Sequence, residues 1–266
     1  MTSREPRFRV GVDIGGTFTD IVLLDADGRV HTKKVSSSVG DYAQAIVEGL
    51  SELFEERELG GGAVDEVIHG TTVASNAILE LRGARTGLIT TRGFRDVLEL
   101  RRLRMPRLYD LTWEKPPALV ERYLRMEVTE RVNARGEIVT PLEAADAERA
   151  LDRLLGEGIE ALAVCLINSY ANPVHEARIK AIVARRAPAL PLCISSEVLP
   201  EIKEFERSST TAVCAYAGPI LASYLERLEQ ATKSRALPPL YLMGSNGGIL
   251  EAARGDGPGE VPAAEI

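Results

Sequence analysis

Hydrophobic and polar residues alternate along the start of the chain with the two-residue period of β-strands. Strands are predicted at Phe8–Ile14, Thr19–Asp25 and Arg29–Ser36, with Asp27-Gly28 as the turn before the third. Strands joined by such short turns pair in antiparallel fashion. We therefore expect the chain to open with three antiparallel strands.

The period then changes to that of amphipathic helices. Apolar residues at helical spacing predict a helix over Asp41–Glu56, which ends before Gly60-Gly61-Gly62. A strand at Val64–His69, a helix at Val73–Leu81 and a strand at Thr86–Thr91 follow. Residues 8–91 thus predict the element order βββαβαβ.

Alternating strands and helices are predicted for the rest of the chain. Thr140-Pro141 and Glu143 predict a helix with a capping box that ends at Gly156. Gly218-Pro219 is expected to kink or interrupt the last helix. The other predicted elements are strands at Glu127–Asn133, Ala161–Ile167, Pro191–Ser195 and Leu240–Met243, and helices at Asn172–Arg186 and Ser208–Lys233. The strand–helix–strand run from residue 161 to 195 predicts a parallel βαβ unit, whose first strand is apolar throughout and therefore covered on both faces.

The composition is that of an ordinary globular protein. The chain has 266 residues, enough for one large or two small domains, with 45% hydrophobic and 27% charged residues. Its formal net charge of −7 argues against a nucleic-acid surface over the whole molecule. No apolar run approaches the roughly 20 residues of a membrane span, and no signal-peptide h-region precedes the first strand. We expect a soluble, cytoplasmic protein without a nucleic-acid or membrane partner.

The stretch from Arg92 to Pro117 is irregular and rich in arginine. A basic run of this kind suggests nucleic-acid binding. Asp96 and Glu99, which lie among the arginines, and the negative net charge favour a solvated face or a subunit contact instead. The arginines concerned are Arg92, Arg95, Arg101, Arg102, Arg104 and Arg107.

The three cysteines, Cys165, Cys193 and Cys214, are widely spaced and lie in apolar surroundings. This pattern predicts reduced, buried thiols, and neither a set of disulfides nor a zinc site.

The turn between the first two strands carries the strongest candidate chemistry. In VGVDIGGTFTDIVLLD, Gly15 and Gly16 let backbone N–H groups approach phosphate oxygens, and the hydroxyls of Thr17 and Thr19 can donate further hydrogen bonds. Asp13 can hold Mg²⁺ directly or through water. The alternative is a tight Gly-Gly hairpin without a ligand. The carboxylate before the glycines and the threonines after them favour the phosphate site.

A second candidate lies where a strand meets a helix, at His69-Gly70-Thr71-Thr72. Its N–H groups and hydroxyls can meet an anion. Equally, Thr71 or Thr72 caps the following helix and His69 satisfies a local hydrogen bond. Asn76, one turn further on, is a substrate contact or a buried polar anchor. In the glycine-rich turn near the end of the chain, Ser245 and Asn246 reach a nucleotide or simply shape the turn.

Several of these segments, in this order, resemble the hydantoinase A/oxoprolinase family. They are RVGVDIGGTFTDIVLLD, HGTTVASNAILELRGARTGLITTRGFRDVLELRR, LYDLTWEKPPALV, ALAVCLINSYANPVHE, SSEVLPEIKEFERSSTTAVCAYAGP and LMGSNGG, which together extend over nearly the whole chain to about Leu250. Members of the family are similar to actin/hexokinase/Hsp70-type ATPases, which hold ATP between two RNase-H-like lobes. They use ATP to open cyclic amides such as 5-oxoproline and N-methylhydantoins, and relatives serve as subunits of acetone or acetophenone carboxylases.

The resemblance implies a fold and a domain organisation. The fold is α/β, with an RNase-H-like, actin-like ATPase lobe of mixed sheet βββαβαβ, then an α/β segment and the start of a second lobe. The implied domains are an N-terminal domain at residues 7–190, the beginning of a core domain at residues 191–250, and a poorly ordered tail at residues 251–266.

The resemblance also implies roles for the candidate residues. Asp13 and His69 are the implied catalytic residues, and Asp13 positions the Mg²⁺ that accompanies ATP. The residues implied to face the nucleotide are Gly15, Gly16, Thr17, Thr19, Thr71, Thr72, Asn76, Ser245 and Asn246. The implied chemistry is phosphorylation of the substrate's amide oxygen, followed by hydrolysis. For Glu204, Arg207, Ser208 and Thr210 a structural ion pair and helix cap is favoured over catalysis.

The chain also departs from the family pattern. The second phosphate turn and the adenosine pocket of the family do not occur in it, and Cys214 stands where an asparagine is expected. We therefore expect a truncated chain, or a site completed by a second-lobe chain, with a hydantoinase B-type subunit as partner and no activity alone. The alternatives are a noncatalytic assembly module that binds its partner through Arg92–Trp113, and a sugar or acetate kinase, which the HGTT and SSEVLPE segments fit poorly.

Overall fold

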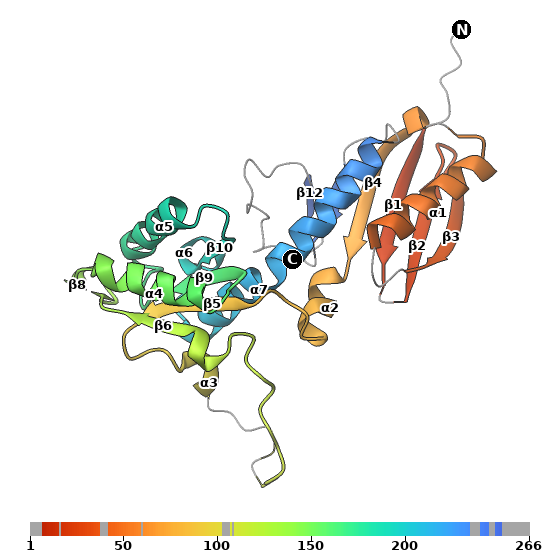
Figure 1. Ribbon diagram of the computed structural model, residues 1–266. Coiled ribbons are helices and arrows are strands. Elements are labelled where there is room, and N and C mark those ends of the chain that lie inside the picture. Colours follow the sequence, from red (N-terminus) through yellow and green to blue (C-terminus); the bar gives the residue numbers. More distant parts are fainter. Residues whose placement is uncertain are drawn as a thin grey trace. The chain divides into compact units, whose positions relative to one another are not determined.

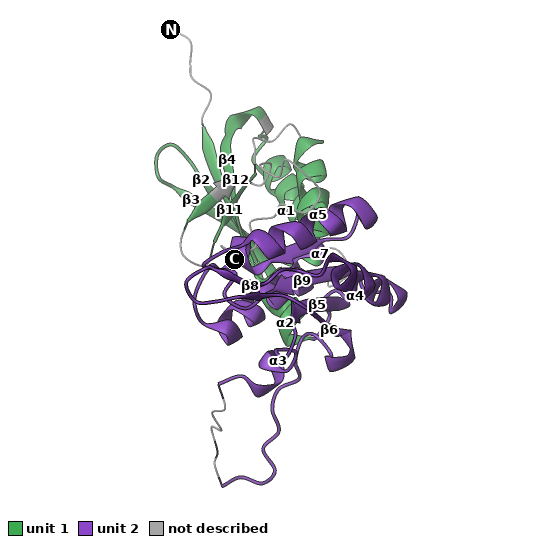
Figure 2. Cartoon of the chain, turned by 90° about the vertical axis from the view of Figure 1, so that its left-hand side faces the viewer, with its two compact units in different colours: residues 1–80, 220–266 green, residues 81–219 purple. Residues whose placement is uncertain are grey.

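The computed structural model describes residues 7–15, 17–37, 42–59, 61–102, 107, 109–234, 240–244 and 248–251. The chain forms two compact units, shown in separate colours in Figure 2. Unit 1 comprises Met1–Glu80 and Ile220–Ile266, and unit 2 comprises Leu81–Pro219. Unit 2 is thus inserted into the sequence of unit 1. The domain boundary expected between residues 190 and 191 stays a prediction.

Unit 1 is built on a six-stranded mixed sheet (Figure 1). β1, β2 and β3 pair in antiparallel fashion, as predicted, whereas β4 lies parallel to β1 and β11 parallel to β4. β12 pairs with β11 in antiparallel fashion at the edge. In order across the sheet, the strands are β12 (Ile249–Glu251), β11 (Leu240–Met243), β4 (Val64–Thr71), β1 (Phe8–Ile14), β2 (Phe18–Leu24) and β3 (Val30–Ser36).

One face of this sheet forms the core of unit 1. β1 buries every second residue, so that Val10, Val12 and Ile14 point to one side and Asp13 to the other. Helix α1 (Tyr42–Glu56) and the end of α7 (Glu204–Lys233) contribute apolar side chains to the same core. The two short helical elements of unit 1, η1 (Gly61–Ala63) and α2 (Val73–Leu79), flank β4 in the sequence. The opposite face of β1 therefore carries the candidate carboxylate.

Unit 2 contains a four-stranded parallel sheet with a second core. Every residue of its strands β5 and β9 is buried, which confirms the prediction of a strand covered on both faces at residues 161–165. Across the sheet the strands are β10 (Leu192–Ile194), β9 (Ala161–Cys165), β5 (Thr86–Thr91) and β6 (Arg125–Val128). The other elements are α3 (Val97–Leu100), η2 (Arg122–Leu124), the hairpin β7 (Arg131–Val132) and β8 (Ile138–Thr140), α4 (Ala144–Gly156), α5 (Val174–Arg186), α6 (Ser195–Val198) and the start of α7.

The element order βββαβαβ is confirmed, but its last strand belongs to another sheet. β5 pairs with β9 and β6 in unit 2, and it has no pairing with the strands of unit 1 in the described part of the chain. Periodicity predicts a strand but not its partner, because pairing depends on residues that are distant in the sequence. The strand predicted at Glu127–Asn133 is likewise divided between β6 and β7, which lie in different sheets.

Three details of the predicted helices differ. The capping box at Thr140 is wrong: Thr140 pairs with Arg131 at the end of β8, and α4 begins at Ala144 without a side-chain cap. α7 begins at Glu204 instead of Ser208, because its first turn is polar and gives no apolar periodicity. Of the kink or interruption predicted at Gly218-Pro219, the interruption is wrong: Pro219 lies inside α7, and it is the last residue of unit 2. The kink stays a prediction.

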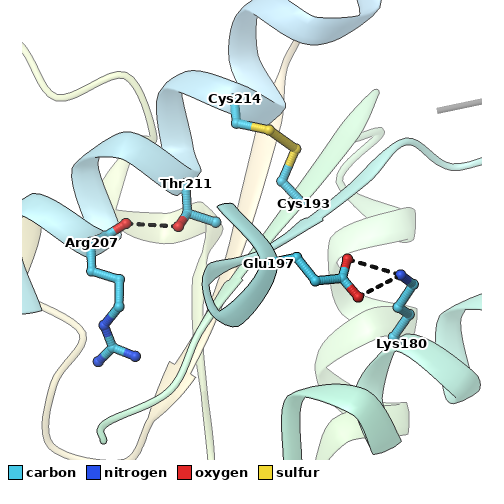
Figure 3. Close-up of a disulfide and its surroundings, with 6 residues drawn as sticks. All are labelled: Lys180, Cys193, Glu197, Arg207, Thr211 and Cys214. Atoms are coloured by element: carbon cyan, nitrogen blue, oxygen red, sulfur yellow. Dashed lines mark hydrogen bonds and ion pairs between the residues drawn. A yellow bond between two sulfur atoms is a disulfide. The ribbon is translucent and has the colours of Figure 1, made fainter. Parts of the chain in front are cut away.

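The prediction of three reduced cysteines is wrong for two of them. Cys193 on β10 and Cys214 on α7 form a disulfide with 6.4 Å between their Cα atoms (Figure 3). Cys165 is free and buried. The spacing of 21 residues does not reveal the pair, because only the packing of α7 against β10 brings the two side chains together.

Among the described residues, no helix combines the length and the apolar character needed to cross a membrane. Gly16, Ser245, Asn246 and the tail from residue 252 lie outside the described residues.

Candidate functional site

The predicted phosphate turn is a tight hairpin between β1 and β2. The Gly15 N–H donates to the Phe18 carbonyl over 2.9 Å and closes the turn. A Cβ at Gly15 would stand 3.2 Å from that carbonyl oxygen, so the turn leaves little room for a side chain. Thr17 and Asp13 are exposed beside it. The hairpin therefore presents a carboxylate and a hydroxyl to solvent.

The Asp13 carboxylate lies over a residue without a side chain. The parallel ladder pairs Asp13 with Gly70 of β4. A Cβ at Gly70 would stand 3.2 Å from Asp13 Oδ1. The glycine of the HGTT segment thus provides the space in which the carboxylate lies.

The charges around Asp13 favour a cation. The antiparallel ladder places Asp20 directly opposite Asp13, and opposed side chains in such a pair are typically about 5 Å apart. Lys34 pairs with Asp20, at 3.2 Å, and its ammonium lies 5.2 Å from the Phe18 ring centroid. Among the described residues, no lysine or arginine forms an ion pair with Asp13, so its negative charge is available to a ligand.

Thr19 lies behind the hairpin instead of facing solvent. It is fully buried, and its hydroxyl lies 2.9 Å from the Ser37 hydroxyl. Ser37 in turn donates to the Gly15 carbonyl over 2.9 Å, and its N–H donates to the Thr17 carbonyl over 2.9 Å. Thr19 and Ser37 thus hold the hairpin in place. Ser37 was not among the residues predicted from the sequence, where its only signal is its position directly after β3.

The two threonines at the end of β4, Thr71 and Thr72, also bind protein groups. Thr72 donates from its hydroxyl to the Ile14 carbonyl over 2.9 Å, and Asn76 donates to the Thr72 hydroxyl over 3.3 Å. Thr71 accepts the Val73 N–H at 3.2 Å. Thr72 is the N-cap residue of α2 but makes no side-chain cap hydrogen bond, so the predicted cap is not formed by Thr72, and only Thr71 bonds to the first turn. The hydrogen bonds of Thr72 and Asn76 connect α2 to the end of β1, next to the hairpin.

His69 is enclosed between the sheet and α7. It has no exposed surface; its Nδ1 lies 3.2 Å from the Val12 carbonyl and its Nε2 lies 2.7 Å from the Tyr224 hydroxyl. The carbonyl can only accept, so Nδ1 carries the proton and Nε2 accepts from tyrosine. Burial lowers the pKa of His69 to about 4, and it raises the pKa of Tyr224. At neutral pH, therefore, an uncharged His69 connects β1, β4 and α7.

The predicted residues therefore form two layers. Asp13 and Thr17 are exposed, with the half-buried Gly15 and Gly70 beside them, whereas Thr19 and His69 are buried behind them. Thr72, which is exposed, and Asn76 hold the hairpin from the side through the end of β1. Among the described residues, no group of three or more His, Cys, Asp and Glu side chains is arranged to hold a metal. Magnesium in nucleotide sites commonly uses one or two carboxylates, water and phosphate oxygens, so a single aspartate suits it only together with a phosphate.

This chain is similar to known proteins in both sequence and fold. Residues 9–187 match the hydantoinase/oxoprolinase N-terminal region. The crystal structure of the ATP-dependent caprolactamase from Pseudomonas jessenii superimposes with a TM-score of 0.86 and 35% identity, over 92% of this chain and 36% of that one. A nucleotide-free acetone carboxylase structure gives a TM-score of 0.84 and 26% identity, over 94% and 38%. The 5-oxoprolinase 1 of Arabidopsis thaliana is 30% identical over 95% of this chain and 22% of its own length.

These similarities agree with the α/β architecture of an actin-like ATPase with a mixed sheet. The chain spans between about a fifth and two fifths of the length of these relatives. The family match covers most of the chain, and the residues of the hairpin and of the HGTT segment lie within it. The chain belongs to the hydantoinase/oxoprolinase family, in its N-terminal region.

Proposed function

We propose that this chain is the N-terminal portion of an ATP-dependent cyclic-amide hydrolase, in which the β1–β2 hairpin binds nucleotide phosphates. The observation that carries the proposal is the position of Asp13 over Gly70 beside a glycine turn. In the described part of the chain this carboxylate has no ion pair, and a hydroxyl and a tight turn lie next to it. These groups can bind a phosphate together with its metal ion.

The residues of the hairpin have distinct proposed tasks. Asp13 holds Mg²⁺ directly or through water, and Thr17 donates to a phosphate oxygen. Gly15 keeps the turn tight enough for backbone N–H groups to face the phosphate. When bound, Mg·ATP supplies the phosphoryl group that activates the amide oxygen of the substrate.

Residues next to the hairpin, two of them buried (Thr19 and His69), position this surface. Thr19 and Ser37 hold the turn, Thr72 holds the end of β1, and His69 holds the register of β1 and β4. We propose a positioning role for His69 in place of the catalytic role expected from the sequence. A side chain without exposed surface and with both ring nitrogens bonded has no access to a substrate.

The proposed site requires further donors to enclose a nucleotide. Acceptors and donors on one side of a phosphate neither exclude water nor neutralise its charge fully. We therefore propose that a second lobe, in the same or another chain, completes the site, and that a hydantoinase B-type subunit assembles with it. The chain alone is expected to be inactive.

The test is an assay of ATP-dependent opening of ε-caprolactam, 5-oxoproline and N-methylhydantoin by the chain, with and without a co-expressed second-lobe chain. Asp13→Ala should reduce the complemented activity at least about 100-fold, the usual cost of losing a charge-stabilising group. Asp65→Asn is the matched control, because Asp65 is an acidic residue at the opposite end of β4 that pairs with Arg7. Unchanged activity in Asp13→Ala contradicts the phosphate site. A stable complex without nucleotide affinity favours the assembly module.

A second candidate function is that of an ATP-binding subunit in an acetone- or acetophenone-type carboxylase. The close superposition on acetone carboxylase favours it. The same preparations, given acetone or acetophenone with bicarbonate and ATP, distinguish the two: carboxylation without cyclic-amide opening supports the carboxylase.

A further inference from the structure

A buried polar cluster lies in unit 2, at the carboxyl ends of β9 and β10. Its members are Ser169 after β9, Ser195 after β10, Glu176 on α5 and Arg207 on α7. All four are at least 98% buried. In the sheet order β10-β9-β5-β6, the direction of the strand connections reverses between β5 and β9. Ligands of open parallel sheets bind at the carboxyl ends of strands beside such a reversal.

Glu176 accepts three hydrogen bonds from protein donors. Its Oε1 accepts the Leu166 N–H at 2.8 Å and the Ser195 hydroxyl at 2.6 Å, and its Oε2 accepts the Ser196 N–H at 2.8 Å. Its carboxylate lies beyond ion-pair distance of the Arg207 guanidinium and is linked to it only through Ser195. The negative charge of Glu176 is therefore near Arg207, but the carboxylate oxygens bond to Leu166, Ser195 and Ser196 and not to the guanidinium.

Arg207 uses only one of its three nitrogens. Its Nη1 donates to the hydroxyls of Ser169 and Ser195, the latter over 3.2 Å. Its Nε and Nη2 are buried and have no hydrogen-bond partner in the described part of the chain. These two nitrogens form one edge of the guanidinium, the edge that binds both oxygens of a carboxylate. Figure 3 shows the side chain extending from α7 away from the Cys193–Cys214 disulfide.

This arrangement is costly unless a ligand uses it. Each buried donor that loses water without gaining a partner costs free energy, and a charged donor costs more than a neutral one. Glu176 offsets part of the charge through Ser195, but it satisfies neither Nε nor Nη2. A group with two coplanar acceptor oxygens and a negative charge would satisfy both.

We propose that the Nε–Nη2 edge of Arg207 binds the carboxylate of a small organic acid. The edge is covered in this structure, so binding displaces a neighbouring group. Tyr170 is one neighbouring group: its half-buried ring centroid lies 5.6 Å from the guanidinium carbon. The proposal concerns unit 2 and does not depend on the function of the hairpin in unit 1.

The experiment is a titration of the ¹⁵N-arginine-labelled chain with sodium acetate, followed through the Nε–Hε resonances, against sodium chloride at equal ionic strength. We expect a saturable shift of the Arg207 resonance with acetate and none with chloride. Arg207→Lys keeps the charge but removes the edge, so its saturable acetate binding, measured calorimetrically, should weaken at least about tenfold. Asp13→Ala should bind acetate as the parent does.

The matched control is Arg125→Lys. Arg125 is equally buried, but its Nη2 already donates to Glu99 over 3.2 Å, so this variant should keep acetate binding. If Arg207→Lys does not fold, the titration of the unmodified chain decides. A shift that fails to saturate, or one that chloride reproduces, overturns the proposal. Equal affinity for inorganic phosphate also overturns it, because it indicates a general anion site.

Discussion

The Asp13 carboxylate lies against the backbone of Gly70, where a Cβ would stand only 3.2 Å from Oδ1. The parallel pairing of β1 and β4 creates this contact between residues that are 57 positions apart in the sequence. It connects the two segments that the sequence singled out separately, the glycine turn and the HGTT segment.

Gly70→Ala should displace the Asp13 carboxylate by a few tenths of an ångström. Such misplacement of a positioned group is expected to lower the complemented ATP-dependent activity about tenfold. The control is Gly11→Ala on β1, whose Cβ would meet, among the described residues, only Val22 Cβ, at 3.9 Å. Steady-state kinetics of both variants check this, and equal activity in the two contradicts the role of Gly70.

The pH dependence of stability should report His69. Its pKa is about 4 in the folded chain, below the ordinary value of 6.5, because burial disfavours the charged ring. Between these values the unfolded chain binds the extra proton, so stability falls as the pH falls from about 6.5 towards 4. The full difference corresponds to about 3 kcal/mol. Urea unfolding at pH 7.5 and 5 should show a smaller pH difference in His69→Gln; an unchanged difference contradicts the prediction.

Gly83→Ala should destabilise unit 2. A Cβ at Gly83 would stand 2.0 Å from Tyr216 Cε1, and the Tyr216 carbonyl already accepts the Ala84 N–H at 2.9 Å, so the ring and backbone are held close. We expect a loss of about 3 kcal/mol in the free energy of unfolding, as for other overpacked sites. Gly156→Ala, with open space around its Cβ, is the control. In a chain that already carries Tyr216→Ala, Gly83→Ala should lower the free energy of unfolding much less than it does in the parent chain.

The disulfide should be visible in thiol counts. Of the three cysteines, only Cys165 is free, so the denatured, unreduced chain should show one reactive thiol, and three after reduction. Reduction should lower the free energy of unfolding by about 3 kcal/mol, because the bridge closes a loop of about twenty residues. Three reactive thiols before reduction would show that the cysteines are unpaired. Cys193→Ala should abolish the effect of the reductant.

The local sequence was sufficient to predict the elements whose formation depends on residues close in the chain. Alternation predicted β1 with its observed bounds, and the glycines predicted the turn after it, since side-chain period and backbone freedom are local properties. The helix caps were less predictable: Thr140 has the residue type of a cap but pairs in a strand, because tertiary pairing outweighs a capping preference.

The sequence by itself determined the order βββαβαβ at the start of the chain, the candidate turn with Asp13 and the family resemblance, because each of these depends on contiguous residues. Only the tertiary structure decided which residues of that turn face outwards. Thr19 is turned into the core by the register of β2 and held by Ser37, and His69 is enclosed by Tyr224 from a helix 155 residues later. The tertiary structure also placed β5 in the second sheet and paired Cys193 with Cys214. It buried Arg207 so that Nε and Nη2 have no partner among the described residues. These outcomes depend on long-range packing, which brings together side chains whose separation in the sequence carries no signal of their contact.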